Sequence, residues 1–275
     1  MTNSLTGHLR KMTSKLEDGL AHYQLPVGEQ SIDMNELIGK HLSLTFTGNI
    51  NCQECGKKTK KSYSQGFCYP CMIKLAKCDM CIMKPETCHF AQGTCREPDW
   101  AEQHCMVPHY VYLANTTAIK VGITRHTQIP TRWIDQGANQ ALPIFKVNTR
   151  LQSGLVEIAL AEFISDKTNW RNMLKGKADP IDLQERAKLL IPQIEEKLAG
   201  IKLEFGEDAV TLLDEEMVEI DFPVLEYPTK ISSFNFDKNP EVSGTLMGIK
   251  GQYLYFDSGV INIRKFTSYE VTASF

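Results

Sequence analysis

The sequence predicts an α+β protein. Antiparallel β segments at its two ends flank a cysteine-rich metal module and a small α/β region. Three observations lead to this prediction. Apolar and polar residues alternate over residues 1–50 and again over 218–275, which is the pattern of half-buried strands. All nine cysteines lie between positions 52 and 105. Residues 109–217 open with two short apolar runs around a polar turn and continue with the spacing of amphipathic helices.

These patterns divide the chain into four expected parts: residues 1–50, 51–108, 109–217 and 218–275. The two ends also resemble each other, since TGHL and HLSLTF near the start correspond to SGTL and YEVTASF near the end. Such similarity is typical of a degenerate internal repeat, although β-rich segments also look alike by chance. We therefore expect the terminal segments to form two small barrel-like units, or one composite barrel, that bracket the middle of the chain.

The length of the chain and the distribution of its charge limit the classes of protein to which it can belong. A chain of 275 residues can form more than one domain. Its net charge of −3 is unevenly spread, because residues 51–150 carry thirteen Lys and Arg against seven Asp and Glu, whereas residues 151–240 carry ten against eighteen. The basic part could face a polyanion. No run of about 18 apolar residues occurs and the first residues lack the apolar stretch of a signal peptide, so we expect a cytoplasmic protein without a membrane partner.

The first four cysteines predict a zinc ribbon. Cys52, Cys55, Cys68 and Cys71 form the spacing C-x2-C-x12-C-x2-C. Two tight pairs presented by turns suit tetrahedral zinc with four thiolate ligands, and Gly56 can adopt the positive φ that such a turn requires. A redox dithiol is the alternative, but the second matched pair argues against it. In a reducing cytosol, clustered cysteines are metal ligands more often than disulfides.

The remaining cysteines predict a second zinc site whose ligands the spacing leaves open. Cys78-x2-Cys81 forms a further pair, and we expect its partners among Cys88, Cys95 and Cys105. A histidine (His89, His104 or His109) could replace one of them. An iron–sulfur cluster is the alternative, because four cysteines alone do not distinguish the metals.

A lysine-rich loop separates the two cysteine pairs of the ribbon. Its sequence, GKKTKKSYSQGF, carries Lys57, Lys58, Lys60 and Lys61 beside two aromatic residues. Cations interleaved with aromatic rings are typical of nucleic-acid binding, since lysine neutralises phosphate and a ring can stack on a base. The alternative is a solubilising loop whose Phe67 forms the small core of the ribbon.

The stretch VYLANTTAIKVGITRHTQIPTRW resembles the GIY-YIG nuclease superfamily. Val111-Tyr112 corresponds to the first motif strand and Lys120-Val121-Gly122 to the second. Arg132 stands where the family arginine is expected, with Arg125 as a second choice, and Glu157 in GLVEIALAEF stands where the family's metal-binding glutamate lies. The resemblance covers roughly residues 109–170 and implies a small α/β nuclease domain.

That resemblance also implies a set of roles. Tyr112 would help to activate a water, Arg132 would stabilise the charge that develops on the phosphate, and Glu157 would hold one Mg²⁺ or Mn²⁺ through a hard oxygen ligand. Lys120 stands where the family usually has its second tyrosine. The lysine could contact phosphate, but the replacement of the tyrosine puts proton transfer in question. A solvated surface position for Glu157 is the alternative, although helical spacing places it at the flank of an apolar stripe.

Nearly the whole chain resembles an uncharacterised bacterial family, domain of unknown function 2797. The match is carried by CQECGKKTKKSYSQGFCYPC, HYVYLANTTAIKVGITR and GIKGQYLYFDSGVINIRK, and it implies no activity. Three hypotheses follow: a metal-dependent phosphodiesterase acting on RNA or DNA, a catalytically inactive nucleic-acid-binding protein, and a zinc-stabilised protein-interaction scaffold. The first two require the loop lysines, Arg125 and Arg132 to converge on one face.

Overall fold

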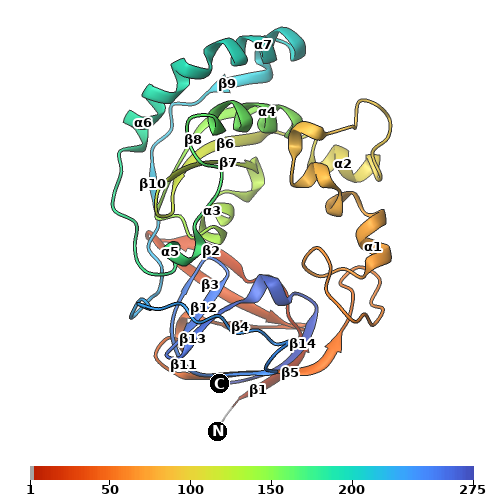
Figure 1. Ribbon diagram of the computed structural model, residues 1–275, viewed down its shortest axis with the longest axis vertical. Helices are drawn as coiled ribbons and strands as arrows, with labels where there is room; N and C mark the ends of the chain where they lie inside the picture. The colour runs from red at the N-terminus through yellow and green to blue at the C-terminus, as the bar shows by residue number, and fades with distance from the viewer. Residues whose placement is uncertain (1–2) are drawn as a thin grey trace.

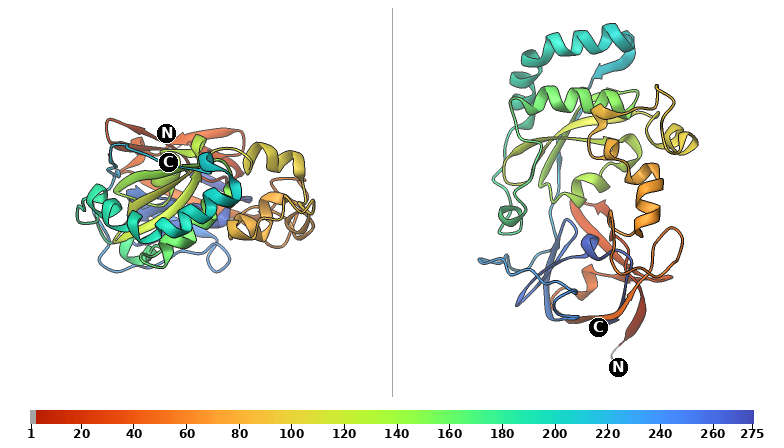
Figure 2. Two further views of the ribbon diagram at one scale, coloured as in Figure 1. Left: turned by 90° about the horizontal axis from the view of Figure 1, so that it is seen from above. Right: turned by 45° about the vertical axis from the view of Figure 1, so that its right-hand side comes forward.

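The computed structural model describes residues 3–275 and contains three sheets whose strands pair antiparallel. Figure 1 shows the terminal sheets at one end of the molecule and the central sheet with its helices at the other. The cysteine-rich segment runs along one side between these two ends, as both Figure 1 and the right-hand view of Figure 2 show. The protein is therefore a mixed α/β protein with several sheets and few helices, which agrees with the predicted class.

Strands from both ends of the chain build the terminal sheets. A six-stranded sheet has the order β1 (Ser4–His8), β14 (Tyr269–Ser274), β5 (His41–Ile50), β11 (Glu241–Lys250), β12 (Tyr253–Phe256) and β13 (Gly259–Asn262). A three-stranded sheet consists of β2 (Thr13–Glu17), β3 (Leu20–Val27) and β4 (Gln30–Asp33). The prediction of antiparallel strands at both ends is confirmed.

The barrel expected from the two ends is wrong. The strand order of the six-stranded sheet runs from β1 to β13 without returning to its start, so within residues 3–275 this sheet stays open. The two ends combine by interleaving, because β5 pairs with β11 on one side and with β14 on the other. Their apolar side chains face the three-stranded sheet, where alternate residues of β3 are buried in the same core. The apolar side chains are therefore buried between two open sheets, and the six-stranded sheet does not need to close into a barrel.

The central sheet is buried on both faces. Its strands are β6 (His109–Asn115), β7 (Ile119–Arg125), β8 (Gln140–Val147), β9 (Val210–Leu212) and β10 (Val218–Glu219). Because side chains alternate along a strand, Val111 and Leu113 of β6 enter one core, whereas Tyr112 and Ala114 enter the other. The first core lies under the long helices and the second is continuous with the core of the terminal sheets.

Helices cover the central sheet where the sequence predicts them. They are α4 (Arg150–Ala161), α6 (Leu183–Leu190) and α7 (Glu195–Phe205), and the short α3 (Thr131–Asp135) and α5 (Trp170–Met173) lie in the connections. Single 3-10 turns complete the chain: Asn35–Leu37, Ala76–Cys78, Met80–Ile82, Pro85–Thr87, His126–Gln128, Ile191–Ile194, Glu207–Ala209 and Ile263–Phe266. Among residues 3–275 no helix is long and apolar enough to cross a membrane.

The cysteine-rich segment has little apolar core. Besides 3-10 turns it contains only two short helices, α1 (Tyr69–Lys74) and α2 (Pro98–His104). Its largest cluster of buried apolar residues consists of Cys52, Phe67 and Cys68. A segment of this size needs another source of folding free energy, and metal ligation supplies it in comparable modules.

One glutamine joins the terminal sheets to α3. Gln252, in the turn between β11 and β12, accepts a hydrogen bond from the backbone N–H of Met12 (2.9 Å) and donates to the Met12 carbonyl (3.1 Å) and to Oδ1 of Asp135 (2.9 Å). Asp135, the last residue of α3, also pairs with Lys11 and has only 3% of its side chain exposed. The position of α3 thus depends on contacts with both ends of the chain.

Replacing Gln252 with Ala should therefore destabilise the protein by on the order of 2 kcal/mol or more, because Asp135 and both Met12 backbone groups lose buried partners. Urea unfolding measures this change. Gln193→Ala is the matched control, since Gln193 is exposed and bonds only within its own helical segment, and it should change the value by less than about 0.5 kcal/mol. Equal effects of the two substitutions would contradict the proposed joining role.

Candidate functional site

The candidate site begins with a cross-strand pair. In the β6–β7 register Tyr112 lies directly opposite Gly122. The Tyr112 side chain is fully buried, and its hydroxyl donates to Oε1 of Gln136 at 2.9 Å. A Cβ atom at Gly122 would lie 2.7 Å from that hydroxyl, so the ring occupies the space that a side chain there would need. This contact explains why a glycine stands in the middle of β7.

A cleft opens beside Gly122, on the side of β7 and α4. It has a volume of about 370 Å³ and is lined by Lys120, Arg132 and Glu157, three of the four catalytic residues predicted from the sequence. Tyr112 is not among the lining residues. Its hydroxyl lies behind Gly122 and next to the Arg132 guanidinium. Burial raises the pKa of Tyr112, and the positive charge of Arg132 partly offsets this rise. The structure therefore brings all four residues together, with Tyr112 beneath the surface of the cleft.

All four parts of the chain contribute residues to the cleft. Ile82, Met83 and Pro85 of the cysteine-rich segment form one wall, and residues of both terminal segments contribute as well. Its charged lining residues are six cations and three carboxylates: Lys11, Lys120, Arg125, Arg132, Arg150 and Arg264, with Asp135, Glu157 and Asp166. The excess of cations suits a ligand that carries several negative charges.

Helix α4 places Glu157 and Arg150 in the cleft. The helix begins after Thr149, whose hydroxyl accepts the Gln152 N–H, while the Gln152 side chain accepts the Thr149 N–H at 2.9 Å. Seven residues separate Arg150 from Glu157, which puts both on one face of the helix. Burial and the neighbouring Asp166 carboxylate raise the pKa of Glu157 to about 7, despite the opposing effect of Arg132 and Arg150.

Lys120 is the most deeply buried cation of the cleft. It is 5% exposed, and burial together with the charge of Arg132 lowers its pKa to about 8. The segment after α4 runs along the edge of β7, where the Ser165 carbonyl accepts the Val121 N–H at 2.9 Å. This pairing brings Asp166 near Lys120 and Glu157. A glutamate that holds its proton up to about pH 7 and a lysine that loses its proton near pH 8 are typical of a functional site.

The predicted nucleic-acid-binding residues do not gather in one place. Arg125 lines the cleft. Lys58 and Lys60 instead line a separate hollow beside Phe46, and Lys58 donates to Oδ1 of Asn49 at 2.7 Å. Lys61 lies over the Tyr63 ring, 5.6 Å from its centre, and Lys57 lines neither hollow. The lysine loop is therefore not part of the cleft.

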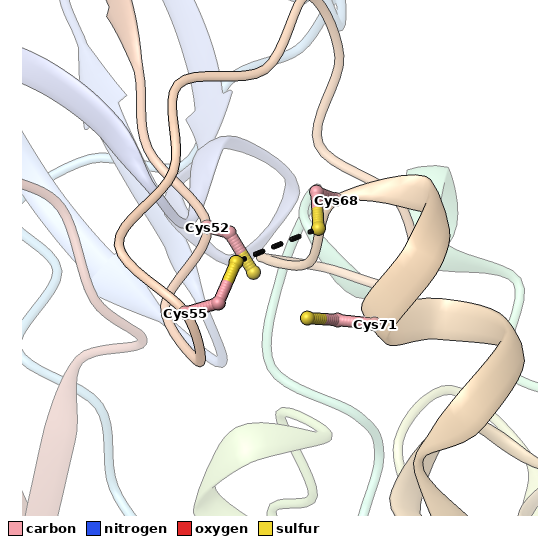
Figure 3. A group of neighbouring side chains, drawn as sticks. All are labelled: Cys52, Cys55, Cys68 and Cys71. Atoms are coloured by element: carbon pink, nitrogen blue, oxygen red, sulfur yellow. Dashed lines mark hydrogen bonds between the residues drawn. The ribbon is translucent and has the colours of Figure 1, made fainter.

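Figure 3 shows Cys52, Cys55, Cys68 and Cys71 pointing toward one another. Their sulfur atoms all lie within 4.8 Å of one another, with 3.7 Å between those of Cys55 and Cys68. Burial raises the pKa of Cys52, but N–H groups of Cys55, Cys68 and Glu54 outweigh this effect and lower it to about 6. Gly56 has a φ of +69°, as the turn requires. This cluster could hold one zinc ion with four thiolate ligands.

The other five cysteines divide between two places. Cys78 packs beside the first cluster, together with Met72 and Leu75. Cys81, Cys88, Cys95 and Cys105 line a separate small cavity. The paired spacing of Cys78 and Cys81 in the sequence therefore does not correspond to one shared cluster in the structure.

The histidines offered as substitute ligands have other surroundings. His89 lies near Asp79 and Cys81, with 3.7 Å between its Nε2 and a carboxylate oxygen of Asp79. His104 stacks on Trp100, and buried His109 is hydrogen-bonded through Nδ1 to the Val107 carbonyl at 2.7 Å. Of these three histidines, His89 is the one grouped with other possible ligand atoms within 4.8 Å.

Several cleft residues were not identified from the sequence. Arg150 could have been found, because its spacing from Glu157 is that of one helix face. Lys11, Arg264 and Asp166 carry no local signal, since strand pairing and the packing of distant segments bring them to the cleft.

Fold and site together define a mixed α/β protein with a four-cysteine cluster that could bind zinc. The chain belongs to a family described as protein of unknown function (DUF2797), whose sequence model matches residues 39–271. No curated protein and no solved structure matches the chain. The likeness of residues 109–170 to GIY-YIG nucleases accordingly stays a prediction.

Replacing Gly122 with Ala should displace the Tyr112 ring and its bond to Gln136, because the new methyl group would overlap the ring. We expect a loss of about 1–3 kcal/mol, the usual effect of overpacking a core. Urea unfolding measures it. Gly200→Ala, at an exposed position of α7 where an added Cβ meets nothing, is the control and should be neutral or stabilising by up to about 1 kcal/mol. A harmless Gly122→Ala substitution would contradict the close contact.

Glu157 should make stability depend on pH. Its pKa near 7 in the folded chain exceeds the ordinary value of 4.5 expected in the unfolded chain. Between these two values the folded chain binds more protons, so the free energy of unfolding falls as the pH rises from 4.5 to 7. Glu157→Gln removes this pH-dependent loss of stability. Above pH 7 the variant should be more stable than the wild type by up to about 3 kcal/mol, whereas near pH 4 the two proteins should differ little.

Urea unfolding of wild type and Glu157→Gln across this pH range tests the expectation. Glu162→Gln is the control, because Glu162 is exposed and pairs only with Lys197. A difference between Glu157→Gln and wild type that stays constant with pH would show that Glu157 titrates near its ordinary value.

Proposed function

We propose that the protein is a metal-dependent phosphodiesterase that acts on RNA or DNA in the cleft between β7, α4 and the cysteine-rich segment. The observation that carries this proposal is that Lys120, Arg132 and Glu157, selected from the sequence by motif, line one open cleft with Tyr112 directly behind it. Tyr112 and Glu157 are 45 positions apart along the chain, and the packing of α4 on the central sheet brings them to the same place. The motif order and the shared cleft are independent observations.

The charges of the cleft support a phosphodiester substrate. Six cations against three carboxylates would attract a phosphate backbone, and the planar guanidinium groups of Arg125 and Arg132 suit paired hydrogen bonds to phosphate oxygens. The volume of about 370 Å³ lies within the range of sites that bind small molecules, which is enough for a nucleotide unit. Lys57, Lys58, Lys60 and Lys61 do not line the cleft, so the convergence with Arg125 and Arg132 that we required of a nucleic-acid-binding protein is not met there. The proposal therefore depends on the six cations of the cleft.

The roles of the residues follow from their chemistry. Hydrolysis forms a bond between a water oxygen and phosphorus and breaks one P–O bond, with the proton of the water passing to a base. Lys120 could be that base in place of the second tyrosine of the GIY-YIG pattern, because a pKa of about 8 leaves part of it neutral at a working pH near 8. Arg132 would stabilise the added negative charge on the phosphate. Tyr112 would position Arg132 and Gln136 from behind.

Glu157 is the residue suited to a divalent cation. Carboxylate oxygens are the ligands that Mg²⁺ and Mn²⁺ prefer, and Asp166 adds a second carboxylate on the same side of the cleft. A bound Mg²⁺ or Mn²⁺ would polarise the phosphate and lower the pKa of its bound water. Ionised Glu157 is needed for such a site, so the affinity for the cation should rise as the pH passes about 7. Zinc in the Cys52–Cys71 cluster would have a structural role, since this cluster does not line the cleft.

Cleavage assays test the proposal. Single-stranded, double-stranded and structured RNA and DNA are incubated with the protein and Mn²⁺ or Mg²⁺. We expect cleavage that Glu157→Gln abolishes and that Arg132→Ala reduces by at least about a hundredfold, as for other charge-stabilising groups. Glu162→Gln, on the exposed side near the end of the same helical segment, is the matched control and should cleave like the wild type.

The second candidate function is nucleic-acid binding without catalysis. The burial of Tyr112 and the lysine at position 120 favour it. In that case no substrate is cleaved, yet binding weakens steeply with salt, and Arg125→Ala lowers the slope of log affinity against log salt by about one. Cleavage that survives Glu157→Gln would mean a contaminant or another site. Absence of binding even at low salt would exclude both candidates and favour a protein-interaction scaffold.

A further inference from the structure

Four cysteines outside the first cluster line one small cavity. Cys81 comes from the 3-10 turn Met80–Ile82, Cys88 follows the turn Pro85–Thr87, Cys95 lies in the next loop, and Cys105 follows α2. The cavity has a volume of about 20 Å³, which is the room needed for a single water or ion. All four are free thiols. The chain thus brings four soft ligands around a space of the size of one ion.

The four sulfur atoms lie farther apart than those of the first cluster. Within residues 3–275 the groups whose ligand atoms all lie within 4.8 Å of one another are the Cys52–Cys71 cluster and the group of Asp79, Cys81 and His89. Zinc bound by four thiolates has its sulfur ligands about 2.3 Å from the ion, so the four side chains would draw together around it.

A partly buried arginine of the cleft lies next to the cavity. Arg150 donates from Nη2 to the Ile82 carbonyl at 2.6 Å, and its backbone N–H donates to the Cys105 carbonyl at 2.7 Å. Its Nε atom is buried without a hydrogen-bond partner, and among residues 3–275 no carboxylate forms an ion pair with it. Glu157 of the same helix face shares the cleft with Arg150. Further negative charge in the cavity would also stabilise the guanidinium.

We propose that Cys81, Cys88, Cys95 and Cys105 hold a second zinc ion, and that Cys78 is not a ligand of either ion. Four thiolates and one Zn²⁺ carry a net charge of −2, which would place negative charge beside the Arg150 guanidinium. The proposal does not depend on the phosphodiesterase, because it rests on the cysteines and on Arg150 alone.

Asp79, Cys81 and His89 form a competing group, since their ligand atoms also lie within 4.8 Å of one another. Asp79 already pairs with the Arg96 guanidinium at 2.5 Å. His89 is hydrogen-bonded through Nδ1 to Thr94 at 2.8 Å, which leaves its Nε2 as the available ligand atom. Asp79 and His89 line the same cavity as the four cysteines. The competing group offers three ligand atoms, whereas the four thiols are the complete set of a structural zinc site. We therefore assign the ion to the four thiols, with Asp79 and His89 as neighbours of the site.

The second ion would also fix one wall of the cleft. The chain between Cys81 and Cys88 supplies Ile82, Met83 and Pro85 to that wall. The same stretch packs tightly on α4, since a Cβ atom added at Gly154 would lie 2.6 Å from the Cβ of Pro85. Zinc at this site would thus hold both the wall and the Arg150 side chain in place.

Metal content and thiol protection test the inference in the full-length protein. Native mass spectrometry of the wild type should show about two zinc ions per chain. Cys88→Ser and Cys71→Ser should each lower this number to about one, by removing a ligand of the second and of the first site. Cys78→Ser is the matched control and should retain about two. Equal zinc loss in Cys78→Ser and Cys88→Ser would overturn the proposed ligand set.

Alkylation of the wild type gives a result that does not depend on the folding of any variant. Iodoacetamide applied to the native protein should label Cys78 alone, as mapped by peptide mass spectrometry, and all nine cysteines should react after chelation and unfolding. One zinc ion per chain with Cys81, Cys88, Cys95 and Cys105 open to alkylation would overturn the inference. So would iron and sulfide in place of zinc.

Discussion

The ring of Tyr112 lies across Gly122 of the neighbouring strand, and much of the site depends on this contact. The ring can lie there only because β7 has no side chain at that position. Its hydroxyl then reaches Gln136, which holds the end of α3, and α3 carries Arg132 into the cleft. On the other side of β6, Val111 and Leu113 pack under α4, which carries Glu157 and Arg150. Alternation along one strand therefore positions the charged groups from both faces of the sheet.

Several features were predictable because they depend on neighbours in the sequence. Cysteine spacing predicts the Cys52–Cys71 cluster, alternation predicts the terminal strands, and helical spacing predicts α4. Features that depend on distant segments were not predictable. Nothing local indicates that β5 lies between β11 and β14, or that Arg264 and Lys11 reach the cleft. The expected barrel failed for this reason, since alternation specifies which side of a strand is buried and not whether the sheet closes.

The same limit applies to the lysine loop and to Cys78. Charge and spacing indicate which residues could act together, but the path of the backbone decides whether they meet. Lys58 turns toward Asn49 and a hollow of the terminal sheets, and Cys78 packs on the first cluster although its spacing pairs it with Cys81. Burial is the largest cause of the altered pKa values of Glu157, Lys120 and Arg150, and groups altered in this way are common at functional sites.

The interleaving of β5 between β11 and β14 has a consequence for synthesis on the ribosome. Strand β5 emerges long before its sheet partners at residues 241–250 and 269–274. During that interval the backbone groups and apolar side chains of β5 lack their final neighbours, while the cysteine-rich segment and the central sheet between them can already form. The six-stranded sheet is completed after the central sheet, and the cleft, which needs both Lys11 and Arg264, acquires its full lining only after Arg264 has left the ribosome.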